Sequence, residues 1–228
     1  MKVLAIQHDA ADPPAAAGEI VQRLGHELRV IRMDRGDAIP KTVDADMLMS
    51  FGGGVSLSGD RFPDWVAEEQ TLMRKYIDAD RRILGVCLGG QMIAAALGET
   101  VRRNEHVELG WHAITRTEAA QADFDWLADS TMVLHWHQDT FAIPAGATHL
   151  FRSVACENQG FAIGNRIFAL QFHLEATEHT VQTFNRVSPL RRREGEFVQS
   201  EERVMAGIDT YLAGQTALLE SLLRNLLN

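Results

Sequence analysis

The feature of this 228-residue chain that most limits its fold is an alternation of short apolar runs with segments of helical spacing in its first hundred residues. The apolar runs have the length of buried strands, and glycine closes two of the helical segments. Strands that alternate with helices predict a parallel, doubly wound sheet flanked by helices. The expected strands are residues 2–7, 27–33, 46–51 and 83–86, and the expected helices are 19–24, 65–76 and 91–97.

The second half of the chain has shorter apolar runs separated by turn-rich segments. The runs at 131–136, 161–163 and 167–172 predict a small antiparallel addition to a mostly parallel α/β sheet. Later segments have helical spacing, at 181–185, 200–212 and 215–227. We expect one domain over 1–187 and a helical C-terminal extension over 188–228. Leucines of that extension form an apolar stripe, which must be buried on the domain or in a homodimer.

Composition disfavours several classes of function. The formal net charge of −9 argues against nucleic-acid binding, because the phosphate backbone requires a net basic surface. No apolar stretch is long enough to span a membrane, and the N-terminus lacks the pattern of a signal peptide. The two cysteines, Cys87 and Cys156, do not make a disulfide framework. We therefore expect a cytoplasmic protein in which Cys87 stays reduced.

Gly85, Cys87 and Gly89 form a Gly-x-Cys-x-Gly motif between an expected strand and an expected helix. This is the thiol counterpart of the nucleophile elbow, a strained turn that needs small neighbours. The N-terminus of the following helix favours the thiolate, and the backbone amide of Leu88 points toward an oxyanion on the attacked carbonyl group. The motif predicts a nucleophile, and a buried structural cysteine is the alternative.

A thiolate nucleophile needs a base, and the base needs an orienting group. An apolar strand ends in His173-Leu174-Glu175, and the strand period of two places the imidazole and the carboxylate on the same side. Glu175 could hold one nitrogen of His173 while the other nitrogen faces Cys87. An ordinary surface pair is the alternative, but the cysteine motif favours the catalytic interpretation.

Three separated motifs together resemble a known enzyme family. They are Gly-Val-Cys-Leu-Gly-Gly-Gln at 85–91, Gly-Gly-Gly at 52–54 and Gln-Phe-His-Leu-Glu at 171–175. Their order and spacing are similar to those of class I, triad-type glutamine amidotransferases over residues 1–185. The chain looks closest to stand-alone domains similar to the glutaminase half of GMP synthase. The resemblance implies a flavodoxin-like glutaminase fold, and we expect no cofactor.

The resemblance also implies a role for each matching residue. Cys87 would attack the side-chain amide of glutamine, giving a γ-glutamyl thioester and ammonia. His173 would protonate the leaving ammonia and then activate water, and Glu175 would orient His173. The implied oxyanion hole consists of the amides of Gly53 and Leu88, and the implied substrate-binding residues are Gln91, Asn158, Gly160, Phe161 and His137, with Asp139 beside His137.

Two departures from the family pattern affect these expectations. Gly54 stands where the family has proline, so we expect a looser oxyanion loop and leave open that it forms only with a partner or substrate. Leu174 also replaces a proline, which keeps the spacing of the triad but removes local stiffness.

His135 and His137 lie on one face of an expected strand, a spacing that a metal site could use. A third ligand is required, and neither cysteine is placed by the sequence to supply it. We therefore expect no metal.

Three functions compete. The first is a glutaminase that passes ammonia to an acceptor bound by a synthetase or other partner protein. The second uses the same triad to hydrolyse γ-glutamyl peptides. The third is a non-catalytic, glutaminase-like regulatory subunit, which the altered loop at Gly53 and Gly54 would suit but the intact triad residues disfavour.

Overall fold

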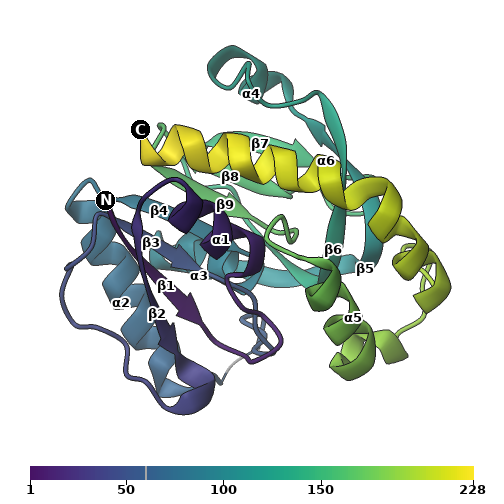
Figure 1. Ribbon diagram of the computed structural model, residues 1–228, viewed down its shortest axis with the longest axis horizontal. Helices are drawn as coiled ribbons and strands as arrows, with labels where there is room; N and C mark the ends of the chain where they lie inside the picture. Colours follow the sequence, from purple (N-terminus) through teal and green to yellow (C-terminus); the bar gives the residue numbers. More distant parts are fainter. Residues whose placement is uncertain (60) are drawn as a thin grey trace.

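The computed structural model describes residues 1–59 and 61–228, which form one sheet of nine strands with helices on both faces (Figure 1). The strands lie in the order β2-β1-β3-β4-β9-β8-β7-β5-β6. They are β1 Lys2–Gln7, β2 Glu27–Arg32, β3 Met47–Ser50, β4 Arg82–Val86, β5 Val101–Arg116, β6 Ser130–Phe141, β7 Thr148–Arg152, β8 Gly160–Ile163 and β9 Ile167–Leu170. The helices are α1 Ala15–Arg23, α2 Asp64–Asp78, α3 Leu88–Ala96, α4 Glu118–Asp123, α5 Glu178–Val187 and α6 Glu201–Leu227, with short 3-10 helices η1 Met33–Arg35 and η2 Pro189–Arg192.

The parallel part of the sheet follows the sequence-based expectation. β2, β1, β3, β4 and β9 pair in parallel, so their carboxyl ends meet at one edge of the sheet. β3 and the interior of β1 are buried on both faces, as expected for strands that helices cover from both sides. In sheets of this kind, ligands bind outside the carboxyl ends of the strands.

The prediction of a mostly parallel sheet with a small antiparallel addition is wrong. Four of the eight strand pairings are antiparallel, and these include the two longest strands, β5 and β6. β5 was missed because its first half carries charged, exposed side chains, such as Arg102, Arg103 and Glu105, in place of an apolar run. Such a strand is stabilised by its pairing with β6, which the sequence of β5 alone does not reveal.

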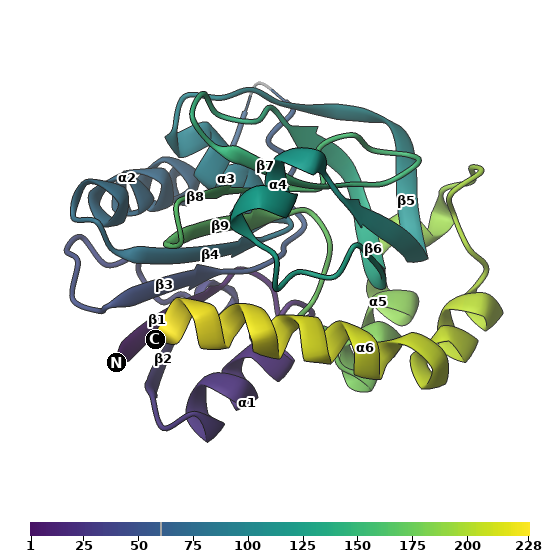
Figure 2. The same ribbon diagram turned by 90° about the horizontal axis from the view of Figure 1, so that it is seen from above.

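Two layers of helices cover the sheet (Figure 2). α1 and α6 lie on one face, where they contact Val3 and Ala5 of β1. α2 and α3 lie on the other face, where they contact Leu4 and Ile6 of the same strand. The alternation of contacts along β1 follows from the period of two of a strand.

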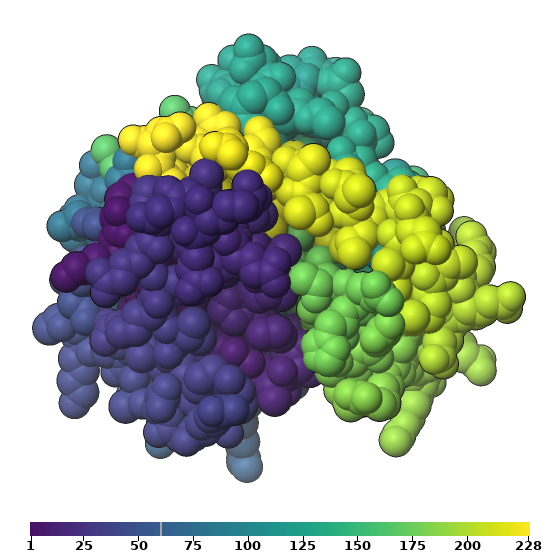
Figure 3. All heavy atoms as spheres, viewed as in Figure 1, coloured from purple at the N-terminus to yellow at the C-terminus, as the bar shows by residue number. Residues whose placement is uncertain are grey.

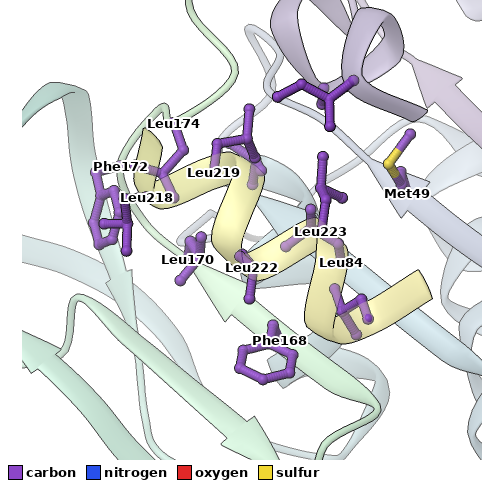
Figure 4. Packing of buried hydrophobic residues seen from close by; sticks show 14 of the residues in the cluster. Met49, Leu84, Phe168, Leu170, Phe172, Leu174, Leu218, Leu219, Leu222 and Leu223 are labelled. Atoms are coloured by element: carbon purple, nitrogen blue, oxygen red, sulfur yellow. The ribbon is translucent and has the colours of Figure 1, made fainter. Parts of the chain in front are cut away.

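The C-terminal segment is one continuous helix, α6, and not the two helices expected. It crosses the molecule beside α1 and α5, as the space-filling view shows (Figure 3). Its leucine stripe packs into the core against strands β3, β4 and β9 and the segment after β9 (Figure 4). The leucines are therefore buried on the sheet of the same chain. The division of the chain at 187 and 188 stays a prediction.

Leu223→Ala is expected to lower the free energy of unfolding by about 2–5 kcal/mol, because Leu223 is fully buried among the core residues of α6 and the sheet. Chemical denaturation measures the change. The matched control is Val154→Ala, whose side chain is 92% exposed and whose effect should stay within about 0.5 kcal/mol. Equal effects of the two substitutions would contradict the burial of α6.

Candidate active site

Cys87 lies at the turn between β4 and α3, and its backbone adopts φ 53° and ψ −109°. This conformation is rare for a residue with a side chain, and strain of this kind gathers at functional sites. Hydrogen bonds hold the turn on both sides. The amide of Cys87 donates to the carbonyl of Leu170 at 2.8 Å, and the amide of Gly89 donates to the carbonyl of Phe51 at 3.1 Å. The sequence-based prediction of an elbow agrees with this geometry.

Gly89 is required at this turn because the first turn of α3 approaches the end of β3 closely. A Cβ atom at this position would overlap the carbonyl oxygen of Ser50, which belongs to β3. The start of α3 can therefore lie directly against the end of that strand only because residue 89 has no side chain. This contact sets the position of Leu88 relative to the glycine loop after β3.

His173 and Glu175 follow β9 and form a buried pair, with His173 Nδ1 and Glu175 Oε1 2.8 Å apart. The amide of His173 donates to the carbonyl of Leu134 at 2.8 Å, which ties the segment to β6. Burial alone would lower the pKa of His173, but the Glu175 carboxylate and Cys87 outweigh it and raise the pKa well above its usual value. The imidazole is therefore held by a carboxylate on one side and interacts with the cysteine on the other.

An open cavity of about 190 Å³ lies at the carboxyl edge of the parallel strands. Cys87 and His173 both line it, and so do four further residues singled out from the sequence, namely Gly53, Leu88, Gln91 and His137. Asp139 lines it as well. The structure therefore brings most of the candidate site residues to one place, as expected for residues at strand ends of one sheet.

Asn158, Gly160 and Phe161 are not among the described residues that line this cavity. The side-chain amide of Asn158 donates to the carbonyl of Phe141 at 2.8 Å, and Phe161 is fully buried in the core beside α3. Gly160 pairs with Leu170 within the sheet. These three residues make contacts within the protein, and their role in substrate binding stays a prediction.

Asp12 is a cavity residue that the sequence did not single out. It lies after β1, and a Cβ atom on Gly52 would meet both its carboxylate and the Cε1 atom of His173. Burial raises the pKa of Asp12 to about 6, with His173 opposing this shift. The one sequence signal that could have identified Asp12 as a site residue is that it follows a strand of the parallel sheet.

The remaining cavity wall has two chemically distinct parts. Carboxylates from Asp9, Asp12 and Asp139 form the polar part, together with the hydroxyl of Ser56. The other part is apolar and comes mainly from α5 and η2, with Trp136 of β6. Its residues are Trp136, Phe184, Val187, Pro189 and Leu190. The cavity can thus contact both a positively charged group and an apolar group of a ligand.

Glu108, His135 and His137 form a buried cluster whose ligand atoms lie within 4.8 Å of one another. Glu108 supplies the third group that the sequence left missing. His137 Nδ1 contacts the carbonyl of Asp139 at 3.0 Å and its Nε2 contacts Glu108 Oε2 at 3.1 Å. Both nitrogens of His137 therefore lie against oxygen atoms of the protein itself. The expectation of no metal stays a prediction.

Comparisons relate the chain to known proteins. The profile of the class I glutamine amidotransferase family matches residues 18–185. The putative glutamine amidotransferase-like protein YfeJ of Salmonella typhimurium is 31% identical over 188 residues, which cover 80% of this chain and 79% of that protein. A glutamine-hydrolyzing GMP synthase subunit of Thermoplasma acidophilum is 31% identical over 166 residues, with 72% and 82% covered. Gamma-glutamyl peptidase 3 of Arabidopsis thaliana is 25% identical over 150 residues, with 62% and 60% covered.

A solved structure with a similar fold also belongs to a glutamine amidotransferase. The crystal structure of a glutamine amidotransferase from Methylobacillus flagellatus superimposes with a TM-score of 0.93 at 28% identity, covering 99% of this chain and 94% of that one. No helix among the described residues combines the length and apolarity needed to cross a membrane. The matched family profile covers most of the chain, including the elbow, the glycine loop and the His173–Glu175 pair. This chain belongs to the class I glutamine amidotransferase family.

Proposed function

We propose that this chain hydrolyses γ-glutamyl amides through Cys87, His173 and Glu175, with glutamine as the substrate. The observation that carries the proposal is that the strained Cys87 shares a cavity with an imidazole held 2.8 Å from a buried carboxylate. A nucleophile, a base and an orienting group are thereby provided by three side chains. A purely regulatory module would not need this arrangement.

In the first half of the proposed reaction, the Cys87 thiolate attacks the side-chain carbonyl carbon of glutamine. The negative charge that develops on the carbonyl oxygen is stabilised by the amides of Gly53 and Leu88, two residues that line the cavity with Cys87. Protonated His173 gives its proton to the amide nitrogen as the carbon–nitrogen bond breaks. The products are ammonia and a γ-glutamyl thioester on Cys87.

In the second half, neutral His173 removes a proton from water as the water oxygen attacks the thioester carbonyl. The carbon–sulfur bond breaks, glutamate leaves, and the Cys87 thiolate and the His173 imidazolium are restored. Glu175 keeps Nδ1 of His173 protonated throughout, so that Nε2 exchanges the proton. The net reaction consumes one water and converts glutamine to glutamate and ammonia.

The released ammonia would pass to an acceptor on a partner protein. The Thermoplasma relative is named as one subunit of a GMP synthase, and this chain resembles it over most of its length. By analogy we propose a synthetase or other acceptor-binding partner.

A second candidate substrate is a γ-glutamyl peptide, and the apolar part of the cavity favours it. Ammonia is small and polar and needs no apolar wall, whereas the amine of a γ-glutamyl dipeptide carries a side chain that Phe184, Val187 and Leu190 could contact. An Arabidopsis relative is named as a gamma-glutamyl peptidase. Hydrolysis of glutamine and of a γ-glutamyl peptide would proceed through the same thioester on Cys87, and the two reactions differ only in the amine that leaves.

A direct comparison of glutamine with γ-glutamyl-leucine separates the two substrates. If the apolar wall binds the leaving amine, the value of kcat/KM for the dipeptide should exceed that for glutamine by about 10- to 100-fold, since burying one leucine side chain contributes about 1.5–3 kcal/mol. Ammonia release and leucine release are measured on the same preparation. A preference for glutamine would favour the glutaminase. Turnover of neither, together with no labelling of Cys87 by a glutamine-analogue electrophile, would overturn the proposed function.

A further inference from the structure

His8 lies directly after β1 and makes contacts that neither the sequence motifs nor the proposed mechanism explains. Its side chain is 3% exposed, and its ring stacks on Trp65 with centroids 5.0 Å apart. His8 Nε2 lies 2.7 Å from Oε2 of Glu69, a carboxylate of α2 that is fully buried. Ser50 donates its hydroxyl to the other oxygen of Glu69 at 2.7 Å. The pair is therefore a specific, buried assembly beneath the glycine loop.

The other nitrogen of His8 faces the glycine loop itself. Nδ1 lies 3.1 Å from the carbonyl oxygen of Phe51 and 3.1 Å from that of Gly52. Carbonyl and carboxylate oxygens only accept hydrogen bonds, so both ring nitrogens of His8 must carry protons to satisfy them. Burial would lower the pKa of His8, but the Glu69 carboxylate and the two carbonyls outweigh it and raise the pKa. His8 is thus an imidazolium that donates to the loop.

The direction of the Gly52 carbonyl fixes the direction of the next amide. In a planar trans peptide the carbonyl of residue 52 and the N–H of residue 53 point to opposite sides. When His8 binds the Gly52 carbonyl on one side of the loop, the Gly53 N–H is turned to the other. Gly53 lines the cavity beside Cys87 and Leu88. A loop of three glycines has little intrinsic preference for this orientation, so an external contact can decide it.

We propose that the His8–Glu69 pair positions the oxyanion hole, by holding the Gly52 carbonyl so that the Gly53 N–H faces the reacting carbonyl group. This inference rests on the proposed function, because it takes Gly53 as an oxyanion donor. His8 is a positioning residue and touches no substrate. The His8–Glu69 pair restricts the loop in the way that a proline at position 54, where this chain has Gly54, would do.

The same contact also links the two oxyanion donors. The carbonyl of Phe51 accepts a hydrogen bond from His8 Nδ1 and another from the amide of Gly89, in the first turn of α3. Leu88, which carries the second donor, immediately precedes Gly89. The carbonyl of Phe51 therefore fixes the position of the glycine loop, residues 52–54, relative to the start of α3. Loss of the His8 contact would disturb the distance between the two donors.

Two substitutions of His8 separate the contact with the loop from the contact with Glu69. The side-chain nitrogen of asparagine is as many bonds from Cα as Nδ1 of histidine, so His8→Asn keeps a donor for Gly52. The nitrogen of glutamine matches Nε2, so His8→Gln keeps the contact with Glu69 and loses the donor for Gly52. Both variants lose the positive charge of His8, so they differ in which of its two contacts they keep.

We expect His8→Gln to lower kcat by about 10- to 100-fold, somewhat less than the complete loss of one oxyanion donor. KM should change by less than about 3-fold, because the Gly53 N–H stabilises the transition state more than it stabilises the bound substrate. His8→Asn should keep kcat within about 5-fold of the wild type, since it retains the contact that fixes the loop. Alkylation of Cys87 by iodoacetamide should proceed at the wild-type rate in both, because that reaction forms no oxyanion.

Several outcomes would overturn the inference. These are an unchanged kcat in His8→Gln, equal losses in both variants, or slower alkylation that parallels the loss of turnover. If either variant is too unstable to assay, the pair is repeated on a Glu69→Gln background, which leaves no buried charge unpaired. If the wild type itself turns over no γ-glutamyl amide, the proposed function fails. Hydrogen exchange at the Gly53 amide then decides the inference separately: faster exchange in His8→Gln than in His8→Asn supports it, and equal rates contradict it.

Discussion

Replacement of Cys87 by alanine is expected to lower kcat for the γ-glutamyl substrate by about 10⁶-fold, the scale of loss when the nucleophile of a triad is removed. No other described cysteine can substitute for it. Cys156 is buried, does not line the cavity, and burial raises the pKa of its thiol to about 11. Steady-state turnover and mass spectrometry of the thioester measure the effect.

Cys156→Ala provides the matched control for Cys87→Ala. It removes the same sulfur from a buried position, where the thiol contacts Thr140 and the carbonyl of Asn158. We expect kcat to be retained, and a γ-glutamyl adduct to be found on Cys87 in that variant. Retained turnover in Cys87→Ala, or an adduct on Cys156, would contradict the assignment of the nucleophile.

Glu175→Gln is expected to lower kcat by about 10⁴-fold, because the neutral amide no longer holds His173 in the required orientation and tautomer. Glu178→Gln is the control, since Glu178 is an exposed carboxylate in the first turn of α5. It should leave turnover unchanged. A similar loss in the two variants, or no loss in Glu175→Gln, would remove Glu175 from the mechanism.

The same substitution has a predictable effect on stability as a function of pH. His173 has a raised pKa in the folded chain, so its protonation stabilises the fold fully below its unfolded pKa of about 6.5. That contribution is lost as the pH rises through the higher, folded pKa. Glu175→Gln removes the main cause of the increase, so this contribution to stability should weaken below about pH 6.5. Thermal unfolding at several pH values, with Glu178→Gln alongside, measures the difference.

The elements whose sequence carries a local signal were predictable. The apolar runs at β1, β3 and β4 and the glycines around Cys87 indicated both the parallel strands and the elbow. His173 and Glu175 were predicted as a pair from their spacing at the end of an apolar run, although β9 ends at Leu170 and both residues lie beyond the strand. Each of these inferences needs only neighbouring residues.

Features that depend on contacts between distant segments were not predictable. The charged first half of β5 is a strand because β6 lies beside it, and Glu108 joins His135 and His137 only through that pairing. His8 and Glu69 are 61 residues apart, so nothing in either segment indicated that they meet beneath the glycine loop. Asn158 was singled out by a short local match; in the folded chain its side-chain amide donates to the carbonyl of Phe141, and its role in substrate binding stays a prediction.

At Cys87, the backbone conformation that presents the proposed nucleophile also lowers the stability of the fold. Its φ of 53° costs a residue with a side chain about 1–3 kcal/mol, a cost that glycine would largely avoid. A glycine at position 87 would relax the turn and remove the sulfur in one step. Selection for thermal stability alone would therefore favour loss of the nucleophile, so a stabilised variant of this chain should be screened for a reactive thiol before it is used.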